Sequence, residues 1–268
     1  MSELEEPIRR YYDAGAEQGR LRESPLERDR TRRLLHRFLP APPARIADVG
    51  GGPGGHALWL AERGYDVALL DAMSLHVDQA IAAGVKEAVV GDARSLPWED
   101  AGFDAVLLFG PLYHLTEGDD RLRAMSEAAR VVRPGGVVMA AAISRFASFV
   151  DGLVHRRFAD PAFREVVDQD IQDGQHRNAG GMPGWFTTAF FHTGDELATE
   201  VGQSGLILRA LLAVEGPGSA LADDTLLEAD PAAWSGLLDM IQRVEAEPSL
   251  LGLSSHIMAV AHRPRRSA

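Results

Sequence analysis

The sequence predicts an α/β protein in which helices cover both faces of a mostly parallel, doubly wound sheet. Between Arg45 and Ser144, short apolar runs alternate with helix-like segments. These apolar runs are continuous and do not alternate with polar residues. Such runs are expected of parallel strands that are buried on both faces. A length of 268 residues allows a sizeable core, as one larger domain or two small ones.

The expected elements follow one another in order through this central region. The strands are expected at "RIADVG", "YDVALLD", "KEAVVGDA", "FDAVLLFG" and "VVMAAAIS". The helices between them are expected at "HALWLAER", before Gly64, at "SLHVDQAIAAG", with Ser74 as N-cap and Gly84 as the stop, and at "DDRLRAMSEAARVVRPGG", ended by Pro134.

The flanking regions have a different pattern. Residues 1–42 are predicted to be helical, and residues 145–191 lose strand character around the helix-like "PAFREVVDQDIQ" and the glycine-rich "NAGGMPGWF". Thr193 and Glu196 then form a capping-box pattern. Two more strands are expected at "LILRALLAVEGPG" and "HIMAVAHRP". We therefore expect a single domain, residues 1–268, with a core (43–145 and 192–268) and a lid (1–42 and 146–191).

Composition limits the partners. The formal net charge of −12 opposes a phosphate-backbone partner, and the basic run "RDRTRR" carries Asp29 and is typical of a solvated helix face. The absence of cysteine excludes disulfides and thiolate metal sites. The N-terminus has no secretory signal pattern, and the longest apolar run is far shorter than the roughly 20 residues that span a bilayer. We expect a cytoplasmic protein with no nucleic-acid and no membrane partner.

A glycine-rich loop follows the first expected strand. Gly50, Gly52 and Gly55 satisfy the GxGxxG pattern, which is usually read as a dinucleotide site. Pro53 removes one backbone N–H from this turn, which weakens a pyrophosphate nest. No GK[ST] follows, so a P-loop is excluded. A ligand without phosphates would be unaffected by the missing donor.

Five landmarks in order give this region a family resemblance. "DVGGGPG", residues 48–54, is similar to the first motif of class I S-adenosylmethionine (SAM)-dependent methyltransferases. Asp71, "GDARSLPW", "FDAVLLFGPLYHL" and "EAARVVRPGGVV" resemble the later motifs of that family over residues 43–145. With the last two strands, the resemblance covers most of the chain. It implies a Rossmann-like seven-stranded sheet with the last strand antiparallel, and SAM as the cofactor.

The resemblance also implies a cofactor site. Asp71 would bind two ribose hydroxyls, and Asp92 would accept a hydrogen bond from the adenine amine beside the Ala93 N–H. Asp48 would contact the methionine end of SAM or orient loop amides. Tyr12 and Arg30 would meet the methionine carboxylate, with Tyr11 and Arg28 as alternatives. The expected cofactor site is Tyr12, Arg30, Asp48, Gly50, Gly51, Gly52, Asp71, Ala72, Met73, Asp92, Ala93, Arg94, Phe109 and Gly110.

Methyl transfer from a sulfonium is an in-line displacement, so alignment can supply most of the catalysis. His114 is the candidate general base on the methyl-facing loop, and the alternative is that it packs under the cofactor. Gly110 stands where methyltransferases of amino bases carry Asn or Asp, which counts against such an acceptor. The expected acceptor site is Tyr11, Tyr113, His114, Trp185, Phe186 and His192.

Other classes of site lack their patterns. The histidines show no H-x-x-x-H spacing, and no G-x-S-x-G elbow is present, so neither a metal site nor a serine hydrolase is expected. The expected acceptor is a small molecule, with a specialised metabolite as one candidate, and its methylated atom (O, N or C) stays open. Two alternatives remain, an NAD(P)-dependent oxidoreductase and a non-catalytic SAM-binding regulator. The oligomeric state is not predicted.

Overall fold

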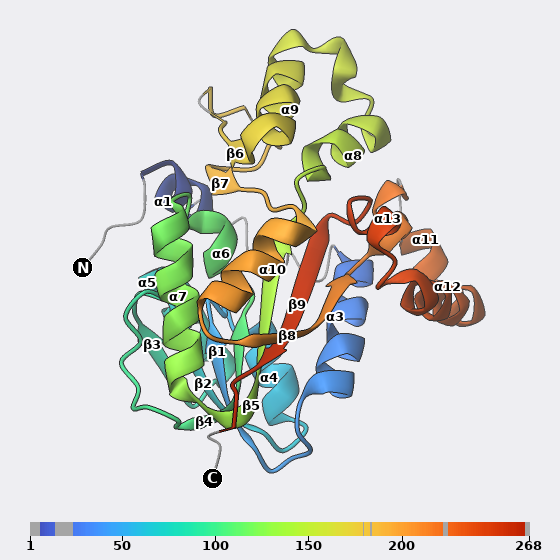
Figure 1. Ribbon diagram of the computed structural model, residues 1–268. Helices are drawn as coiled ribbons and strands as arrows, with labels where there is room; N and C mark the ends of the chain where they lie inside the picture. The colour runs from blue at the N-terminus through green and yellow to red at the C-terminus, as the bar shows by residue number, and fades with distance from the viewer. Residues whose placement is uncertain (1–5, 14–23, 179, 183, 222–224, 266–268) are drawn as a thin grey trace.

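The computed structural model describes residues 6–13, 24–178, 180–182, 184–221 and 225–265. Its centre is a seven-stranded sheet in the order β3-β2-β1-β4-β5-β9-β8, with helices on both faces (Figure 1). The first five strands are parallel, and β9 pairs antiparallel with both β5 and β8. The predicted fold class is confirmed. The strands are β1 (Arg45–Val49), β2 (Asp66–Asp71), β3 (Glu87–Val90), β4 (Phe103–Leu108), β5 (Val132–Ile143), β8 (Ile207–Ala213) and β9 (His256–His262).

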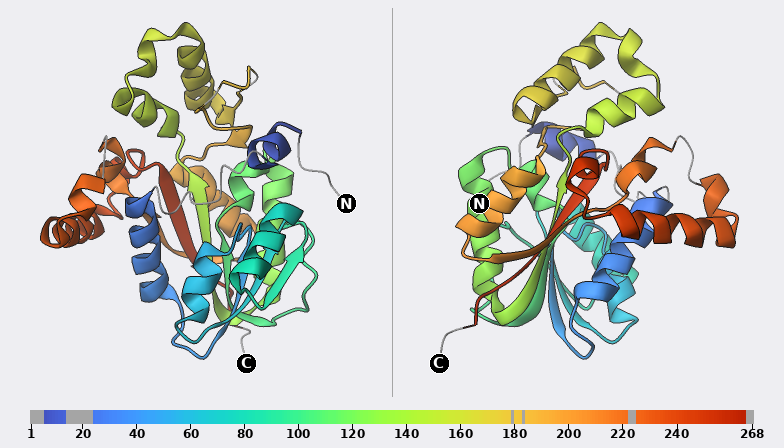
Figure 2. Two further views of the ribbon diagram at one scale, coloured as in Figure 1. Left: turned by 180° about the vertical axis from the view of Figure 1, so that it is seen from behind. Right: turned by 45° about the vertical axis from the view of Figure 1, so that its right-hand side comes forward.

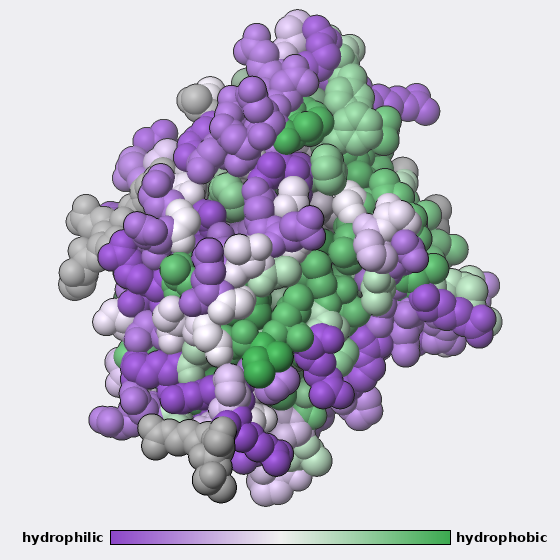
Figure 3. Space-filling model, in the orientation of Figure 1, coloured by the Kyte–Doolittle hydropathy of each residue, from purple (hydrophilic) through white to green (hydrophobic). Residues whose placement is uncertain are grey.

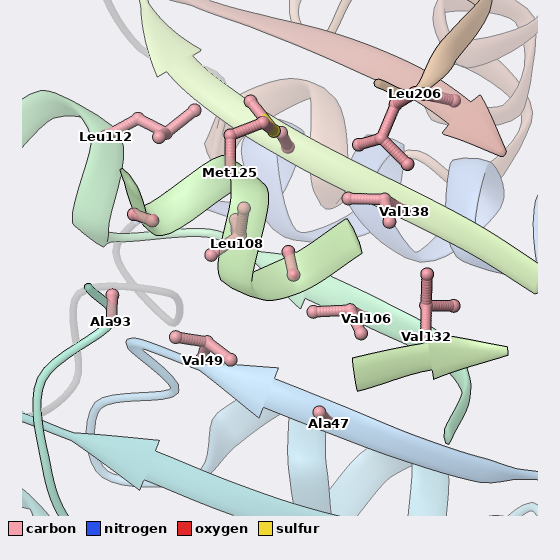
Figure 4. Packing of buried hydrophobic residues seen from close by; sticks show 14 of the residues in the cluster. Ala47, Val49, Ala93, Val106, Leu108, Leu112, Met125, Val132, Val138 and Leu206 are labelled. Atoms are coloured by element: carbon pink, nitrogen blue, oxygen red, sulfur yellow. The ribbon is translucent and has the colours of Figure 1, made fainter. Parts of the chain in front are cut away.

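Two apolar clusters, one on each face, hold the helices to this sheet. On one face, Val49, Val106 and Leu108 pack with residues of α7 (Gly118–Val131) and α10 (Gly194–Gln203), as the labelled Met125 shows in Figure 4. On the other face, Leu69 and Leu107 pack against α3 (Pro25–Phe38), α4 (Gly55–Ala61) and α5 (Ser74–Ala83). Burial on both faces explains why the central strands are continuous apolar runs.

Local signals place most helix ends. Gly84 ends α5 with a φ of +108°, a left-handed conformation that favours glycine. The capping box of α10 is confirmed, because Thr193 Oγ1 accepts from the Glu196 N–H and Glu196 Oε2 accepts from the Thr193 N–H. Ser74 is the first helical residue and Met73 the N-cap, one position before the expected cap.

The fifth strand begins earlier than its apolar run. It starts at Val132 and continues through Pro134, although the sequence predicted a helix end there and a strand from Val137. The pairing of β4 with β5 shifts register between Phe103 and Ala105, opposite this segment. A proline is tolerated at such an irregularity because no regular ladder hydrogen bond is lost.

Residues 146–191, called the lobe below, project beyond the carboxyl ends of the parallel strands (Figures 1 and 2). The lobe contains α8 (Ala147–Val154), the 3-10 turn η1 (Arg157–Ala159), α9 (Pro161–Asp173) and the short antiparallel pair β6 (Gln175–His176) and β7 (Ala189–Phe190). Arg145, at its base, donates from Nε to the Phe191 carbonyl and forms an ion pair with Glu196. This anchors the lobe to α10.

The remaining elements surround the sheet. They are α1 (Glu6–Asp13), α6 (Pro111–His114), η2 (Gly216–Ala220), α11 (Thr225–Glu228), α12 (Pro231–Val244) and α13 (Pro248–Leu251), the last four being inserted between β8 and β9. In Figure 3, hydrophobic side chains gather near the middle of the face drawn. Ile207 of the edge strand β8 is one of the exposed large hydrophobic residues. Among the described residues, no helix combines the length and hydropathy needed to cross a bilayer.

Candidate active site

A large cavity opens at the carboxyl ends of the parallel strands, where open α/β sheets bind their ligands. Its volume is about 1440 Å³. A site for one small molecule usually measures roughly 300–1,000 Å³, so this cavity has room for a cofactor and a second molecule. The predicted cofactor residues that line it are Tyr12, Asp48, Gly50, Gly51, Gly52, Asp71, Ala72, Met73, Asp92, Ala93, Arg94, Phe109 and Gly110.

The glycine loop lies directly against the loop that follows β4. Gly50 has a φ of +74°, and a Cβ atom there would lie 2.6 Å from Pro111 Cδ. A Cβ atom at Gly110 would lie 3.0 Å from the Gly50 carbonyl oxygen. The close approach of the two loops explains why position 110 carries glycine and not the polar residue of amino-base methyltransferases.

Asp48 is a buried carboxylate at the foot of this cavity. It is 1% exposed, and neither of its carboxylate oxygens has a hydrogen-bond partner among the described residues. Burial, together with the nearby charge of Asp71, raises the pKa of Asp48 to about 7. A buried carboxylate without a partner is costly, and a cationic ligand removes that cost. The α-ammonium group of SAM is such a cation, so this site fits the cofactor.

Asp71 connects two loops at the carboxyl end of β2. Its Oδ2 accepts from the Gly52 N–H, and its Oδ1 accepts from the Met73 N–H, each at 2.9 Å. The Nδ1 atom of His76 lies 3.0 Å from the same Oδ1. A carboxylate offers about four acceptor positions, so Asp71 can hold the glycine loop and still meet a ligand hydroxyl. The sequence did not predict His76, because its contact with Asp71 depends on where α5 begins.

Asp92 is held by its neighbour Arg94. The Arg94 backbone N–H donates to Asp92 Oδ1 at 2.9 Å, and its guanidinium forms an ion pair with the same carboxylate at 2.7 Å. Arg94 also pairs with Asp120 of α7. Asp92 therefore both caps its own turn and lines the cavity. Its contact with adenine stays a prediction.

Aromatic rings from three segments surround His114. The Tyr12 hydroxyl and His114 Nε2 are 2.5 Å apart, and Phe186 of the lobe stacks on the imidazole with ring centroids separated by 5.7 Å. Tyr113 and Tyr11 also contact Phe186 edge-on. Burial lowers the pKa of His114 to about 4, so the ring is neutral at pH 7. These rings join the N-terminal helix, the methyl-facing loop and the lobe.

Five of the expected site residues are not among those that line the cavity: Tyr11, Arg30, Trp185, Phe186 and His192. Arg30 is fully buried, donates from Nε to the Val214 carbonyl and pairs with Glu245, so it faces the core and not the cavity. Arg28 and Arg32 line the cavity in its place, because residues four apart share one face of a helix.

Trp185 and His192 contact other parts of the protein. Trp185 packs edge-on against Phe163 inside the lobe. His192 is buried, with Nε2 lying 3.1 Å from Glu200 Oε2. Neither residue is among those that line the cavity. Trp185 contacts the ring of Phe163, whereas its neighbour Phe186 contacts the ring of His114.

A cluster of titratable groups was missed entirely. Glu27 and His256 line the cavity. One ring nitrogen of His256 and one carboxylate oxygen each of Glu27 and Glu215 lie within 4.8 Å of one another. The sequence predicted no metal site, and that stays a prediction. The three residues come from α3, the end of β8 and the start of β9, so no local spacing could have revealed them.

Residues 47–140 match the model of a methyltransferase domain. An uncharacterised methyltransferase of Mycobacterium tuberculosis is 39% identical over 100 residues, 37% of this chain and 40% of that protein. A probable tRNA methyltransferase 9B of Homo sapiens is 38% identical over 110 residues, 41% of this chain and 23% of that protein. The chain thus matches less than half the length of these relatives.

Solved structures extend the likeness to the fold of most of the chain. A SAM-dependent methyltransferase from Methanosarcina mazei superposes with a TM-score of 0.59 at 18% identity, covering 87% of this chain and 98% of that one. The family model, the ordered motifs and the sheet topology agree with one another. Residues 47–140 are therefore similar to methyltransferase domains, and the fold of the described residues is that of the class I, Rossmann-like, S-adenosylmethionine-dependent methyltransferases.

Proposed function

We propose that this protein transfers a methyl group from SAM to a small-molecule acceptor. The observation that carries the proposal is the unpaired, buried carboxylate of Asp48 in a cavity of about 1440 Å³ at the carboxyl ends of the parallel strands. SAM supplies an electrophilic methyl group on a sulfonium, and Asp48 supplies the negative charge for its ammonium group. The remaining volume accommodates the acceptor.

The cofactor residues divide by the part of SAM that they bind. Asp71 holds the ribose hydroxyls, and Asp92 with the Ala93 N–H holds the adenine. Arg32 lines the cavity, and its Nε has no hydrogen-bond partner among the described residues. It offers a cation for the methionine carboxylate, with Arg28 on the same helix face and Tyr12 opposite.

Enclosure by aromatic rings supports a small acceptor. Tyr113 and His114 line the cavity, and Phe186 packs on both from the lobe. Walls of this kind exclude water and align a compact acceptor with the methyl group. The net charge of −12 also disfavours a polyanionic acceptor such as tRNA, which the human relative's name raises.

A methyl-transfer screen tests this function directly. The purified protein is incubated with SAM carrying a labelled methyl group and either metabolite extracts or total tRNA. We expect label in a small-molecule fraction and none in tRNA. Label in tRNA alone would contradict the small-molecule acceptor, and no transfer to any pool would favour a SAM-binding regulator.

A further inference from the structure

His256 and Glu215 form a hydrogen-bonded pair at the wall of the cavity. Glu215 is 5% exposed and lies two residues after the last residue of β8, and His256 is the first residue of β9. The His256 Nδ1 atom lies 2.6 Å from Glu215 Oε1. His256 lines the same cavity as Asp48 and Gly110. His256 therefore faces the proposed reaction chamber, and Glu215 contacts it from outside the residues that line the chamber.

The surrounding contacts fix the carboxylate of Glu215 in place. Its Oε2 accepts from the Ser254 hydroxyl at 2.8 Å and from the His256 backbone N–H at 2.9 Å. Ser254 Oγ in turn accepts from the backbone N–H groups of Glu215 and Gly216. Glu215 thus holds both the backbone and the ring of His256. A ring held in this way has one orientation and one tautomer.

The tautomer follows from the chemistry of the two groups. A carboxylate is only an acceptor, so Nδ1 must carry the proton that joins it to Glu215. Nε2 of the neutral ring is then the basic nitrogen. The Glu215 charge would stabilise an imidazolium formed by protonation of Nε2, just as the aspartate of the Ser-His-Asp triad stabilises its histidine.

We propose that His256, positioned by Glu215, is the general base that accepts the proton of a hydroxyl or amino group on the acceptor. This inference rests on the proposed function and narrows its acceptor to one methylated on oxygen or nitrogen. The acceptor atom forms its bond to the methyl carbon, the carbon–sulfur bond breaks, and the electron pair remains on sulfur. The proton of the acceptor passes to Nε2 of His256 and from there to solvent.

Other charged groups face this pair from neighbouring elements. Glu27 of α3 lies within the same 4.8 Å cluster, on the cavity side. Arg30 of the same helix bonds the Val214 carbonyl, one residue before Glu215, and its charge is paired with Glu245. The two carboxylates near His256 both favour the imidazolium that forms when a proton is accepted.

The first test reads the tautomer and needs no acceptor. NMR spectra of the ¹⁵N-histidine-labelled protein should show His256 with the proton on Nδ1. Glu215→Gln, whose amide can donate as well as accept, should shift the ring toward the other tautomer. A His256 ring protonated on Nε2 in the unaltered protein would overturn the inference.

The second test compares turnover with binding, using the acceptor found in the methyl-transfer screen. His256→Asn keeps a side-chain donor for Glu215 but has no counterpart of Nε2. It should lower kcat by about 10²–10⁴-fold. The KM of the acceptor and the Kd of S-adenosylhomocysteine, measured by calorimetry, should stay within about threefold. The matched control is His262→Gln, at the opposite end of β9, which should leave kcat unchanged.

The outcomes separate this inference from the function on which it rests. Turnover of His256→Asn within tenfold of the unaltered protein overturns the role of His256 and leaves the methyltransferase proposal intact. Absence of turnover in the unaltered protein, with S-adenosylhomocysteine bound, overturns both. A methylated product with the new methyl group on carbon also overturns the narrowed acceptor class.

Discussion

At the scale of single residues, Asp48 shows how a binding site is built at a cost in stability. The folded protein without cofactor buries this carboxyl group with no partner for either oxygen among the described residues. Its pKa is about 7 in the folded state, against 3.8 for an ordinary aspartate. The folded state therefore binds the Asp48 proton more tightly than the unfolded chain does. The stability from this group is fully present below about pH 3.8 and is lost as the pH rises through about 7.

Replacing Asp48 with asparagine should separate stability from cofactor binding. At pH 8, Asp48→Asn should raise the free energy of unfolding of the cofactor-free protein by about 1–3 kcal/mol, because no charge is buried. At pH 4 the difference should largely disappear. Urea unfolding across this range measures both values, and calorimetry should show weaker binding of S-adenosylhomocysteine. A variant less stable than the unaltered protein at pH 8 would contradict this reading of Asp48.

His114 illustrates a residue whose two predicted roles the structure helps to separate. The sequence left general base and packing residue both open. Its hydrogen bond to Tyr12, its stacking on Phe186 and its lowered pKa favour the packing role. His114→Ala should lower kcat by less than tenfold, since a ring with a pKa of about 4 is a weak base at pH 7. A hundredfold loss of kcat with unchanged S-adenosylhomocysteine affinity would restore the catalytic role.

At the scale of elements, the site depends on two loops that touch without side chains between them. Gly110 has a φ of −146°, so its backbone conformation alone does not require glycine. The requirement is space, because a Cβ atom would lie 3.0 Å from the Gly50 carbonyl oxygen. Both loops line the cavity, so moving them apart changes the cofactor site.

Gly110→Ala should therefore weaken S-adenosylhomocysteine binding by tenfold or more and lower the melting temperature. The control is Gly236→Ala on the exposed face of α12, where a Cβ atom would meet nothing within 4 Å. Alanine there should stabilise the helix by roughly 0.5–1 kcal/mol without changing affinity. Calorimetry and thermal unfolding of the two variants measure both effects. Equal affinities for Gly110→Ala and the unaltered protein would show that the loops tolerate separation.

At the scale of the whole molecule, the sequence predicted what local patterns encode. The strands, the capping box of α10 and the cofactor loops follow from apolar runs and short motifs. The sequence did not show which side of α3 faces the cavity, because Arg30 meets Glu245 only when distant segments pack together. The same holds for Glu215 and His256, which approach each other through the antiparallel pairing of β8 with β9.

The contacts of the lobe were the hardest part of the structure to predict from the sequence, and a mutation at Phe186 tests them. Phe186 reaches the rings of Tyr11, Tyr113 and His114, whereas Trp185 packs inside the lobe. Phe186→Ala should raise the KM of the acceptor at least fivefold and leave S-adenosylhomocysteine affinity within twofold. The control is Phe149→Ala, since Phe149 is 41% exposed on α8. An unchanged KM in Phe186→Ala would reduce the lobe to a static cover.

Calorimetry with S-adenosylhomocysteine and, separately, with NADH tests directly whether this cavity is a SAM site. We expect one S-adenosylhomocysteine bound per chain and no heat from NADH, because the glycine loop lacks a donor at Pro53. Asp71→Asn should weaken that binding by about 1–3 kcal/mol, the range for a hydrogen bond to a charged group. Binding of NADH, or no binding of S-adenosylhomocysteine to the unaltered protein, would contradict the account.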